Sequence, residues 1–155
     1  MRKLLVLIGC LAAASLVIPA GASASVAARK KAPVKLSGKV NNHGTKTVKG
    51  TSIEVEQDDY YFGPTFIKAK PGTTLTINLK NEGTEAHNFS IDDQHIDQTV
   101  DPDGKATVTV TVPATGIVNF YCKFHLTTNG MQGAIFTKAG GTAAAKANST
   151  TSGNG

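Results

Sequence analysis

Thr73-Thr74-Leu75-Thr76-Ile77-Asn78-Leu79-Lys80 decides the fold class of this chain, because its apolar side chains stand at every second position. A period of two is typical of a β-strand that buries one face and exposes the other to water, as strands of antiparallel sheets do. The same alternation recurs at Ile53 and Val55 and over residues 106–112. Turn signals such as Pro71-Gly72 separate the runs, and no stretch has a helical period long enough to predict a helix. Short strands at this spacing predict an all-β sandwich or a small barrel.

Four further strands are expected in the same part of the chain, at 66–70, 87–91, 117–121 and 133–137. Apolar residues gather there between turn signals made of Gly, Pro and Asn. Together the strands span residues 51–138, which we expect to form one domain. A domain of this length is small but lies within the range that folds alone.

The N-terminus has the three-part layout of a secretory signal peptide. Arg2 and Lys3 precede an apolar stretch over 4–18, and small residues follow at 21–25. We therefore expect residues 1–24 to be a signal peptide cleaved after Ala24, and the mature protein to be exported to an extracellular, periplasmic or cell-surface location. Two alternatives stay open. One is a lipoprotein lipidated at Cys10, although the apolar run before this residue is short; the other is a retained anchor, although 4–18 is shorter than the about 20 residues that span a bilayer.

Charge divides the rest of the chain into regions. Residues 29–49 hold seven basic residues and no acid, whereas residues 50–138 hold eleven acids and six lysines. The basic stretch has few large apolar side chains, so we expect residues 25–50 to be a disordered linker, either a tether or a weak contact with membrane or cell wall. Residues 139–155 are a low-complexity tail that we also expect to be disordered. Because the domain is acidic and lacks interleaved basic and aromatic residues, nucleic acid is not expected as a partner.

Cys122 is the one cysteine that remains after removal of a signal peptide. Secreted proteins normally pair their cysteines, so an unpaired one is a reactive thiol, an intermolecular crosslink or a metal ligand. The alternative is a buried structural cysteine that packs as a small apolar side chain. Cys122 opens the run Cys122-Lys123-Phe124-His125-Leu126-Thr127-Thr128-Asn129-Gly130-Met131, which adds an imidazole and a thioether within ten residues. This clustering favours a soft metal site in the loop between two strands.

A second imidazole has to come from one of the three other histidines. His43 lies in the basic linker, and His95 lies among acids in a segment that we expect to be an exposed loop. His87 stands at a turn-to-strand junction, so one end of the sheet could bring it to the loop of Cys122. Two imidazoles and a thiolate, with a weak thioether along the axis, are the ligand set of a mononuclear blue-copper centre. Zinc could take the first three ligands, but the thioether of Met131 favours copper.

These motifs resemble the cupredoxins, the blue-copper family that includes plastocyanin and pseudoazurin. The resemblance covers about residues 51–138. It rests on Phe62-Gly63-Pro64-Thr65-Phe66-Ile67-Lys68-Ala69-Lys70-Pro71-Gly72-Thr73-Thr74-Leu75, on His87-Asn88, and on Tyr121-Cys122-x-x-His125-x-x-x-x-x-Met131-x-Gly133. The gap between His125 and Met131 is one residue longer than plastocyanin or pseudoazurin leads us to expect.

The resemblance implies a single Greek-key β-sandwich that binds one copper ion. His87, Cys122 and His125 would be the equatorial ligands and Met131 the axial ligand. Asn88 would join the two ligand-bearing loops by hydrogen bonds, as residues around a metal site commonly do.

The function that this implies is one-electron transfer between Cu(I) and Cu(II) without bond chemistry, so we do not expect an enzyme. Electrons would pass through the edge of His125, between Phe124 and Leu126, to a weakly docked redox partner protein. We expect a monomer. Two alternatives stay open: an exported copper-handling protein that captures or delivers the metal through the same residues, and a metal-free β-sandwich binding module in which the cluster is coincidental.

Overall fold

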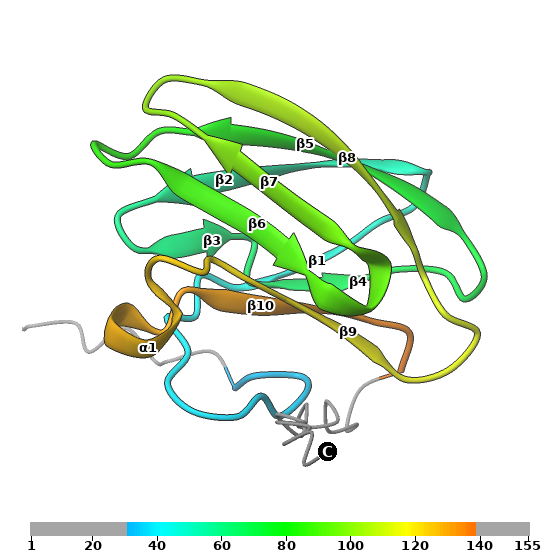
Figure 1. Cartoon of the computed structure of the whole chain (residues 1–155). Helices are drawn as coiled ribbons and strands as arrows, with labels where there is room; N and C mark the ends of the chain where they lie inside the picture. Colours follow the sequence, from blue (N-terminus) through cyan, green and yellow to red (C-terminus); the bar gives the residue numbers. More distant parts are fainter. Residues whose placement is uncertain (1–30, 139–155) are drawn as a thin grey trace, which may run out of the picture.

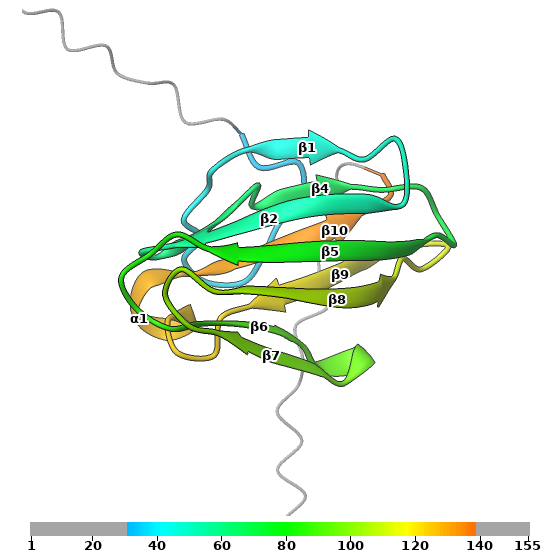
Figure 2. The same ribbon diagram turned by 90° about the horizontal axis from the view of Figure 1, so that it is seen from above.

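The computed structural model describes residues 31–138, which form two β-sheets lying face to face (Figures 1 and 2). The six-stranded sheet has the order β1 (Thr45–Thr47), β4 (Phe66–Lys68), β10 (Gln132–Phe136), β9 (Ile117–Tyr121), β6 (His87–Ile91) and β7 (Ile96–Val100). The four-stranded sheet has the order β3 (Tyr61–Gly63), β2 (Ser52–Asp58), β5 (Thr74–Asn81) and β8 (Lys105–Thr111). A 3-10 turn η1 (Asp92–Gln94) and a one-turn helix α1 (Leu126–Asn129) connect strands. The predicted β-sandwich is confirmed.

The alternating residues of the sequence form the core between the sheets. Leu75, Ile77 and Leu79 of β5 are buried, while their polar neighbours face outward. Three aromatic rings fill the middle, because Phe62, Phe89 and Phe120 contact one another with ring centroids 4.9–5.8 Å apart. Burial of such rings is a large apolar contribution to stability. The core therefore fixes the relative position of the two sheets, and with it the strand ends that carry the site.

Strand direction differs from the expected antiparallel arrangement. β2 pairs with β5 in parallel, and β4 pairs in parallel with both β1 and β10, whereas β5–β8, β6–β7 and β9–β10 are antiparallel. An alternating pattern reports that one face of a strand is buried. It does not report which way the neighbouring strand runs, so the direction could not be derived from it.

β7 replaces part of the segment that we expected to be an exposed loop. Its residues are exposed or half-buried except for Val100, as suits a strand at the edge of a sheet, and this weak pattern hid it in the sequence. The expectation for His95 itself is confirmed, since this residue is exposed at the turn between η1 and β7. Its φ of 52° is left-handed, which ends η1 and turns the chain into the strand.

The segment before residue 51 is not a free linker over the part that the structure describes. β1 pairs with β4, and Val34 and Leu36 are buried against Phe66 and Phe136 on the outer face of the six-stranded sheet. The basic composition was misleading, because two well-spaced apolar residues are enough to anchor a short segment on an apolar face. The folded unit therefore begins before residue 51.

Several expectations lie outside the described residues: the signal peptide at 1–24, the lipidation alternative at Cys10, and the tail at 139–155. Within residues 31–138, no helix is both long and apolar enough to cross a membrane.

Candidate metal centre

The four predicted ligands come from neighbouring strand ends on one side of the sandwich. His87 is the first residue of β6, and Cys122 directly follows β9. His125 precedes α1, and Met131 lies between α1 and β10. Since β6 and β9 are adjacent and antiparallel, the start of one meets the end of the other. Both views show α1 at this end of the molecule.

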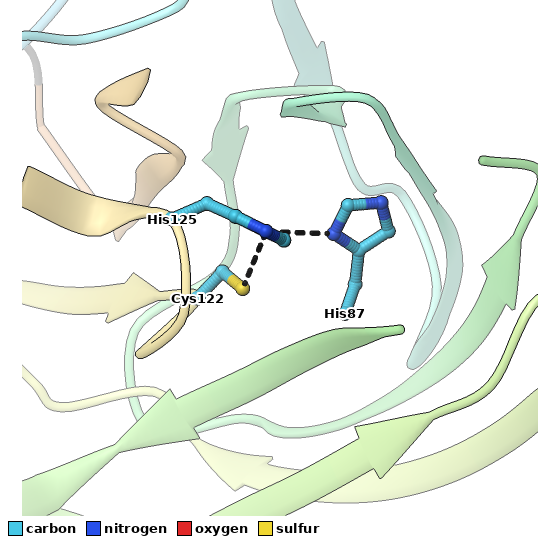
Figure 3. A group of neighbouring side chains, drawn as sticks. All are labelled: His87, Cys122 and His125. Carbon is cyan, nitrogen blue, oxygen red and sulfur yellow. Dashed lines mark hydrogen bonds between the residues drawn. The ribbon is translucent and has the colours of Figure 1, made fainter. Parts of the chain in front are cut away.

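Three of the donor atoms point toward one another (Figure 3). The two Nδ1 atoms of His87 and His125 are 3.2 Å apart, and Nδ1 of His125 is 3.5 Å from Sγ of Cys122. One ligand atom from each of these residues lies within 4.8 Å of the others. His87 and Cys122 are fully buried, and the side chain of His125 is 13% exposed. The arrangement is thus a compact, nearly dry group of two nitrogens and one sulfur.

These separations suit donors that share one ion. For a first-row ion with nitrogens at about 2.0 Å and sulfur at about 2.3 Å in tetrahedral directions, donor pairs lie about 3.3 Å (N and N) and 3.5 Å (N and S) apart. The observed 3.2 and 3.5 Å agree with this. Thiolate and imidazole together are a soft donor set that selects copper or zinc. Met131, the residue that the sequence offers as a thioether donor, is joined to Cys122 by a backbone hydrogen bond, and a thioether added to this set favours copper.

The outer nitrogen of each ring meets a carboxylate. Nε2 of His87 is 3.2 Å from Oδ1 of Asp59, and Nε2 of His125 is 3.1 Å from Oε2 of Glu85. An ionised carboxylate only accepts hydrogen bonds, so each Nε2 is the donor. In a neutral ring, Nδ1 then carries a free lone pair. Two such lone pairs facing each other at 3.2 Å repel unless a cation lies between them, which is a second indication that the site is built for a metal.

Met131 is buried, and its backbone is hydrogen-bonded to the same loop. Its carbonyl accepts a hydrogen bond from the backbone N–H of Cys122 (2.9 Å), and its own N–H is 3.3 Å from the carbonyl of His125. Gly130, with φ 72°, turns the chain from α1 into Met131, a conformation that glycine adopts without a steric cost. The backbone of Met131 is therefore tied to two of the other predicted ligands.

Asn88 contacts both ligand-bearing segments, as the resemblance to cupredoxins led us to expect. Its backbone N–H is 3.4 Å from Sγ of Cys122, and its side-chain oxygen accepts a longer hydrogen bond, 3.4 Å, from the N–H of Lys123. Its amide nitrogen donates to Asp97 at 2.6 Å. A backbone N–H directed at the sulfur fixes the direction in which the cysteine side chain points. The same residue thus orients the cysteine and links β6 to the loop.

Burial governs the electrostatics of the inner histidine. Desolvation lowers the pKa of His87, and the hydrogen bond with Asp59 partly opposes that shift. The hydrogen bonds from Thr84 lower the pKa of Asp59, so this carboxylate stays ionised beside the ring. A neutral His87 with an ionised neighbour is the protonation state in which Nδ1 can bind a metal.

The surface around His125 combines apolar and charged groups. Phe124 is the large apolar side chain that stands out as exposed among the described residues, at 46%. Glu85 lies on another side of the ring and accepts a hydrogen bond of 3.2 Å from Tyr60, whose pKa it raises. The ring of Tyr60 contacts that of His125 with centroids 4.6 Å apart. The face is therefore less uniformly apolar than the flanking Phe124 and Leu126 suggested.

Sequence reasoning missed two functional candidates, Asp59 and Glu85. Glu85 stands two residues before His87, a proximity that could have signalled a local role. Asp59 comes from the β2–β3 turn, and no local pattern connects that turn with His87. It was missed because only the tertiary fold brings the two together.

Comparison with known proteins agrees with this reading. The family model described as "Cupredoxin-like domain" matches residues 12–136. Among curated proteins, none matches the sequence.

Solved structures supply similar chains at low identity. One is the dithionite-reduced auracyanin of the photosynthetic bacterium Roseiflexus castenholzii, with 21% identity over 57% of this chain and 97% of that chain and a TM-score of 0.49. Auracyanin A, a blue copper protein of Chloroflexus aurantiacus, has 20% identity over 60% of this chain and 100% of its own, with a TM-score of 0.47. The metal-binding domain of the Cu(I)-exporting P-type ATPase CopA of Streptococcus pneumoniae D39 has 13% identity over 67% of this chain and 94% of its own, with a TM-score of 0.47. Since the family model covers well over half of the sequence, the chain belongs to the cupredoxin-like domain family.

Proposed function

We propose that the chain is an exported mononuclear type 1 copper protein that carries one electron at a time. The observation that carries this proposal is the convergence of His87 Nδ1, His125 Nδ1 and Cys122 Sγ at distances that suit one shared ion. In this proposal those three residues would hold the ion, with Met131 as a fourth, weaker ligand. Copper supplies the one-electron couple when it is bound.

The fold supports rapid electron transfer by holding the ligands still. His87 belongs to a strand paired on both sides, and Cys122 is fixed by backbone hydrogen bonds to Met131 and His125. Cu(I) and Cu(II) prefer different geometries, so a rigid donor set limits how far the site rearranges when the oxidation state changes. Less rearrangement means a lower barrier. The chain forms and breaks no covalent bond in this role, so we do not propose an enzyme.

The exit route that we propose is the ring of His125. It is the one of the three clustered donors that reaches solvent, and exposed Phe124 lies beside it. A redox partner protein would dock weakly there. The domain surface is acidic overall, which favours a partner with a positively charged docking face.

Export is part of the proposal and is supported by the sequence of residues 1–24. A basic start, an apolar stretch and small residues before the expected cleavage after Ala24 form that signal. We propose an extracytoplasmic location, with the protein released, surface-bound or periplasmic according to the cell. Mass spectrometry of the mature N-terminus would test the cleavage site, and a lipidated Cys10 would contradict it.

The copper centre is tested by titrating the metal-free protein with Cu(II). We expect an intense absorption near 600 nm, roughly where copper–thiolate charge transfer falls for this ligand set. The band should vanish in Cys122→Ser and in His87→Gln. His95→Gln is the matched control, because His95 is an exposed histidine outside the cluster, and it should keep the band. A colourless copper complex would contradict the proposal, and no binding at all would favour the metal-free binding module.

A copper-handling protein is the second candidate. It is favoured by the partial exposure of His125, since a ligand that reaches solvent gives a copper acceptor access to the ion. The two candidates differ in exchange rate. A carrier should survive repeated reduction and reoxidation without losing metal to a competing chelator, whereas a handling protein should transfer copper to that chelator and cycle poorly.

A further inference from the structure

The two clustered histidines share a feature that plays no part in the ligand assignment, a carboxylate at the outer nitrogen of each ring. In each ring Nδ1 faces the other donors, and Nε2 faces a carboxylate. His87 is paired with Asp59 and His125 with Glu85, at 3.2 and 3.1 Å. Neither carboxylate is within the group that could hold the ion. Neither is placed as a ligand, so each would act on the metal through its histidine and through the field of its charge.

Asp59 is held firmly in this position. Its carboxylate accepts hydrogen bonds from the backbone N–H of Thr84 at 3.1 Å and from the hydroxyl of Thr84 at 2.6 Å. Its side chain is 25% exposed, while His87 is completely buried. Gly83 makes room for the pair, because a Cβ there would stand 2.5 Å from Oδ1 of Asp59 and 2.8 Å from Nε2 of His87. Two neighbouring residues, Gly83 and Thr84, are thus arranged around the hydrogen bond between Asp59 and His87.

Glu85 is held less firmly. Its second oxygen accepts the hydroxyl of Tyr60 at 3.2 Å, and the Tyr60 ring packs on His125. The side chain of Glu85 is 54% exposed, so water and salt screen its charge. Its influence on the site should therefore be the smaller of the two.

We infer that Asp59 and Glu85 are positioning residues that orient the two imidazoles so that each Nδ1 is free for the ion. The two carboxylates also lower the reduction potential of the bound copper, Asp59 more than Glu85. A carboxylate on the far nitrogen fixes the tautomer and makes the ring a stronger donor. A stronger, partly anionic donor favours the more highly charged ion, Cu(II), over Cu(I). This inference rests on the proposed copper function and adds to it the sign of the tuning.

The first measurement needs no copper. Nitrogen NMR of the metal-free protein at pH 8, above the ordinary pKa of histidine of about 6.5, reports which ring nitrogen carries the proton. His87 should carry it on Nε2, and Asp59→Ala should lose that preference. A parent protein whose His87 is protonated on Nδ1 would overturn the orienting role, whether or not copper binds.

The second measurement is the reduction potential of the copper-loaded protein. Asp59→Asn keeps an acceptor oxygen but removes the charge, and it should lower the ratio of Cu(II) to Cu(I) affinity about tenfold, which equals a rise of about 59 mV for one electron. Asp58→Asn is the matched control, because it removes the same charge one residue away. The Asp58 carboxylate accepts from Tyr61 and from the backbone N–H of Asp59, and an asparagine oxygen can still accept the second of these bonds. Glu85→Gln should raise the potential less, with an effect that shrinks as salt is added, against Glu82→Gln as its control.

The possible outcomes distinguish a failure of this inference from a failure of the proposed copper function. A blue, reversible centre in which Asp59→Asn and Asp58→Asn have the same potential would overturn the tuning role and leave the carrier intact. A parent protein that binds no copper would overturn both. A selective rise in Asp59→Asn, together with the Nε2 proton on His87, would establish the inference.

Discussion

The three clustered side chains differ in burial, and this difference suits them to different roles at the centre. His87 is buried on all sides and faces Asp59, so it is suited to hold an ion rather than to exchange electrons with a partner. His125 is equivalent in chemistry but reaches the surface, so it is suited to do both. Cys122 contributes the softest donor and is buried, where no second cysteine of the described residues could pair with it.

Gly83 is predicted to be required for the inner histidine. Gly83→Ala would place a methyl group against Asp59 and His87 at distances that real Cβ atoms do not show. We expect a loss of about 1–3 kcal/mol in the free energy of unfolding of the metal-free protein, as overpacking typically costs. We also expect a higher reduction potential, because the hydrogen bond is pushed apart. Urea unfolding and redox titration measure the two effects.

The control is Gly50→Ala, at a glycine with open space around it. It should change neither the unfolding curve nor the potential appreciably. If Gly83→Ala behaves like this control, the side chains around Asp59 can move to accommodate the methyl group, and the packing at Gly83 does not constrain the His87 ring.

Met131 is predicted to tune the centre without being needed for metal binding. Met131→Leu keeps a buried apolar side chain of similar volume, so the stability of the metal-free protein should change by less than about 1.5 kcal/mol. Copper should stay bound, and the potential should rise because the axial ligand is one of its determinants. Redox titration of the blue protein checks this. An unchanged potential would mean that the thioether is not a ligand.

Among the elements, β6, β7 and the ligand loop are joined by polar contacts at the site end. Asn88 of β6 donates to Asp97 of β7, and Lys123 of the loop contacts the same carboxylate at 2.7 and 2.9 Å. Edge strand β7 is thereby tied to the loop that carries Cys122.

Lys123→Met is predicted to raise the pKa of Asp97, because the hydrogen bond from Lys123 is the main cause of its lowered value. A carboxyl whose folded pKa is lowered stabilises the protein above its unfolded pKa of about 3.9, and this contribution disappears as the pH falls through the folded pKa. The parent should therefore exceed the variant in stability at pH 5 and lose that advantage below pH 4. Carbon NMR of the Asp97 carboxyl follows the titration directly. Lys105→Met, on β8, is the control and should leave the Asp97 curve in place.

The sequence revealed those elements whose burial follows a simple period. Leu75, Ile77 and Leu79 predicted β5 because one face of that strand is core. β7 escaped because an edge strand buries little, and the parallel pairing of β2 with β5 escaped because alternation carries no direction. The proposed ligands were recognised because cysteine, histidine and methionine are rare in this chain and because Cys122, His125 and Met131 lie within ten residues of one another. Asp59 was not, since carboxylates are common and its partner is 28 residues away.

At the scale of the whole molecule, the segment before residue 51 packs on the six-stranded sheet and contacts the ligand loop. Val34 and Leu36 anchor it on the sheet. Beyond them, Gln132 donates to the carbonyls of Ser37 and Lys39 at 2.7 Å. The N–H of Asn41 donates to the carbonyl of Gly130 at 3.0 Å. The loop that carries His125 and Met131 is thus covered by a part of the chain far away in sequence.

A protein reduced to residues 51–138 is therefore predicted to fold poorly. It would expose the face around Phe66 and Phe136 and remove the acceptors of Gln132.

In the full chain, Leu36→Ala should cost about 2–5 kcal/mol of the free energy of unfolding, as loss of a buried leucine does. Lys35→Ala, at an exposed position between the two anchors, should cost little. Urea unfolding separates the two, and weakening of the blue band in Leu36→Ala at temperatures below its unfolding would show that the anchor also steadies the ligand loop. Equal stabilities for Leu36→Ala and Lys35→Ala would mean that the segment contacts the sheet without contributing to the free energy of unfolding.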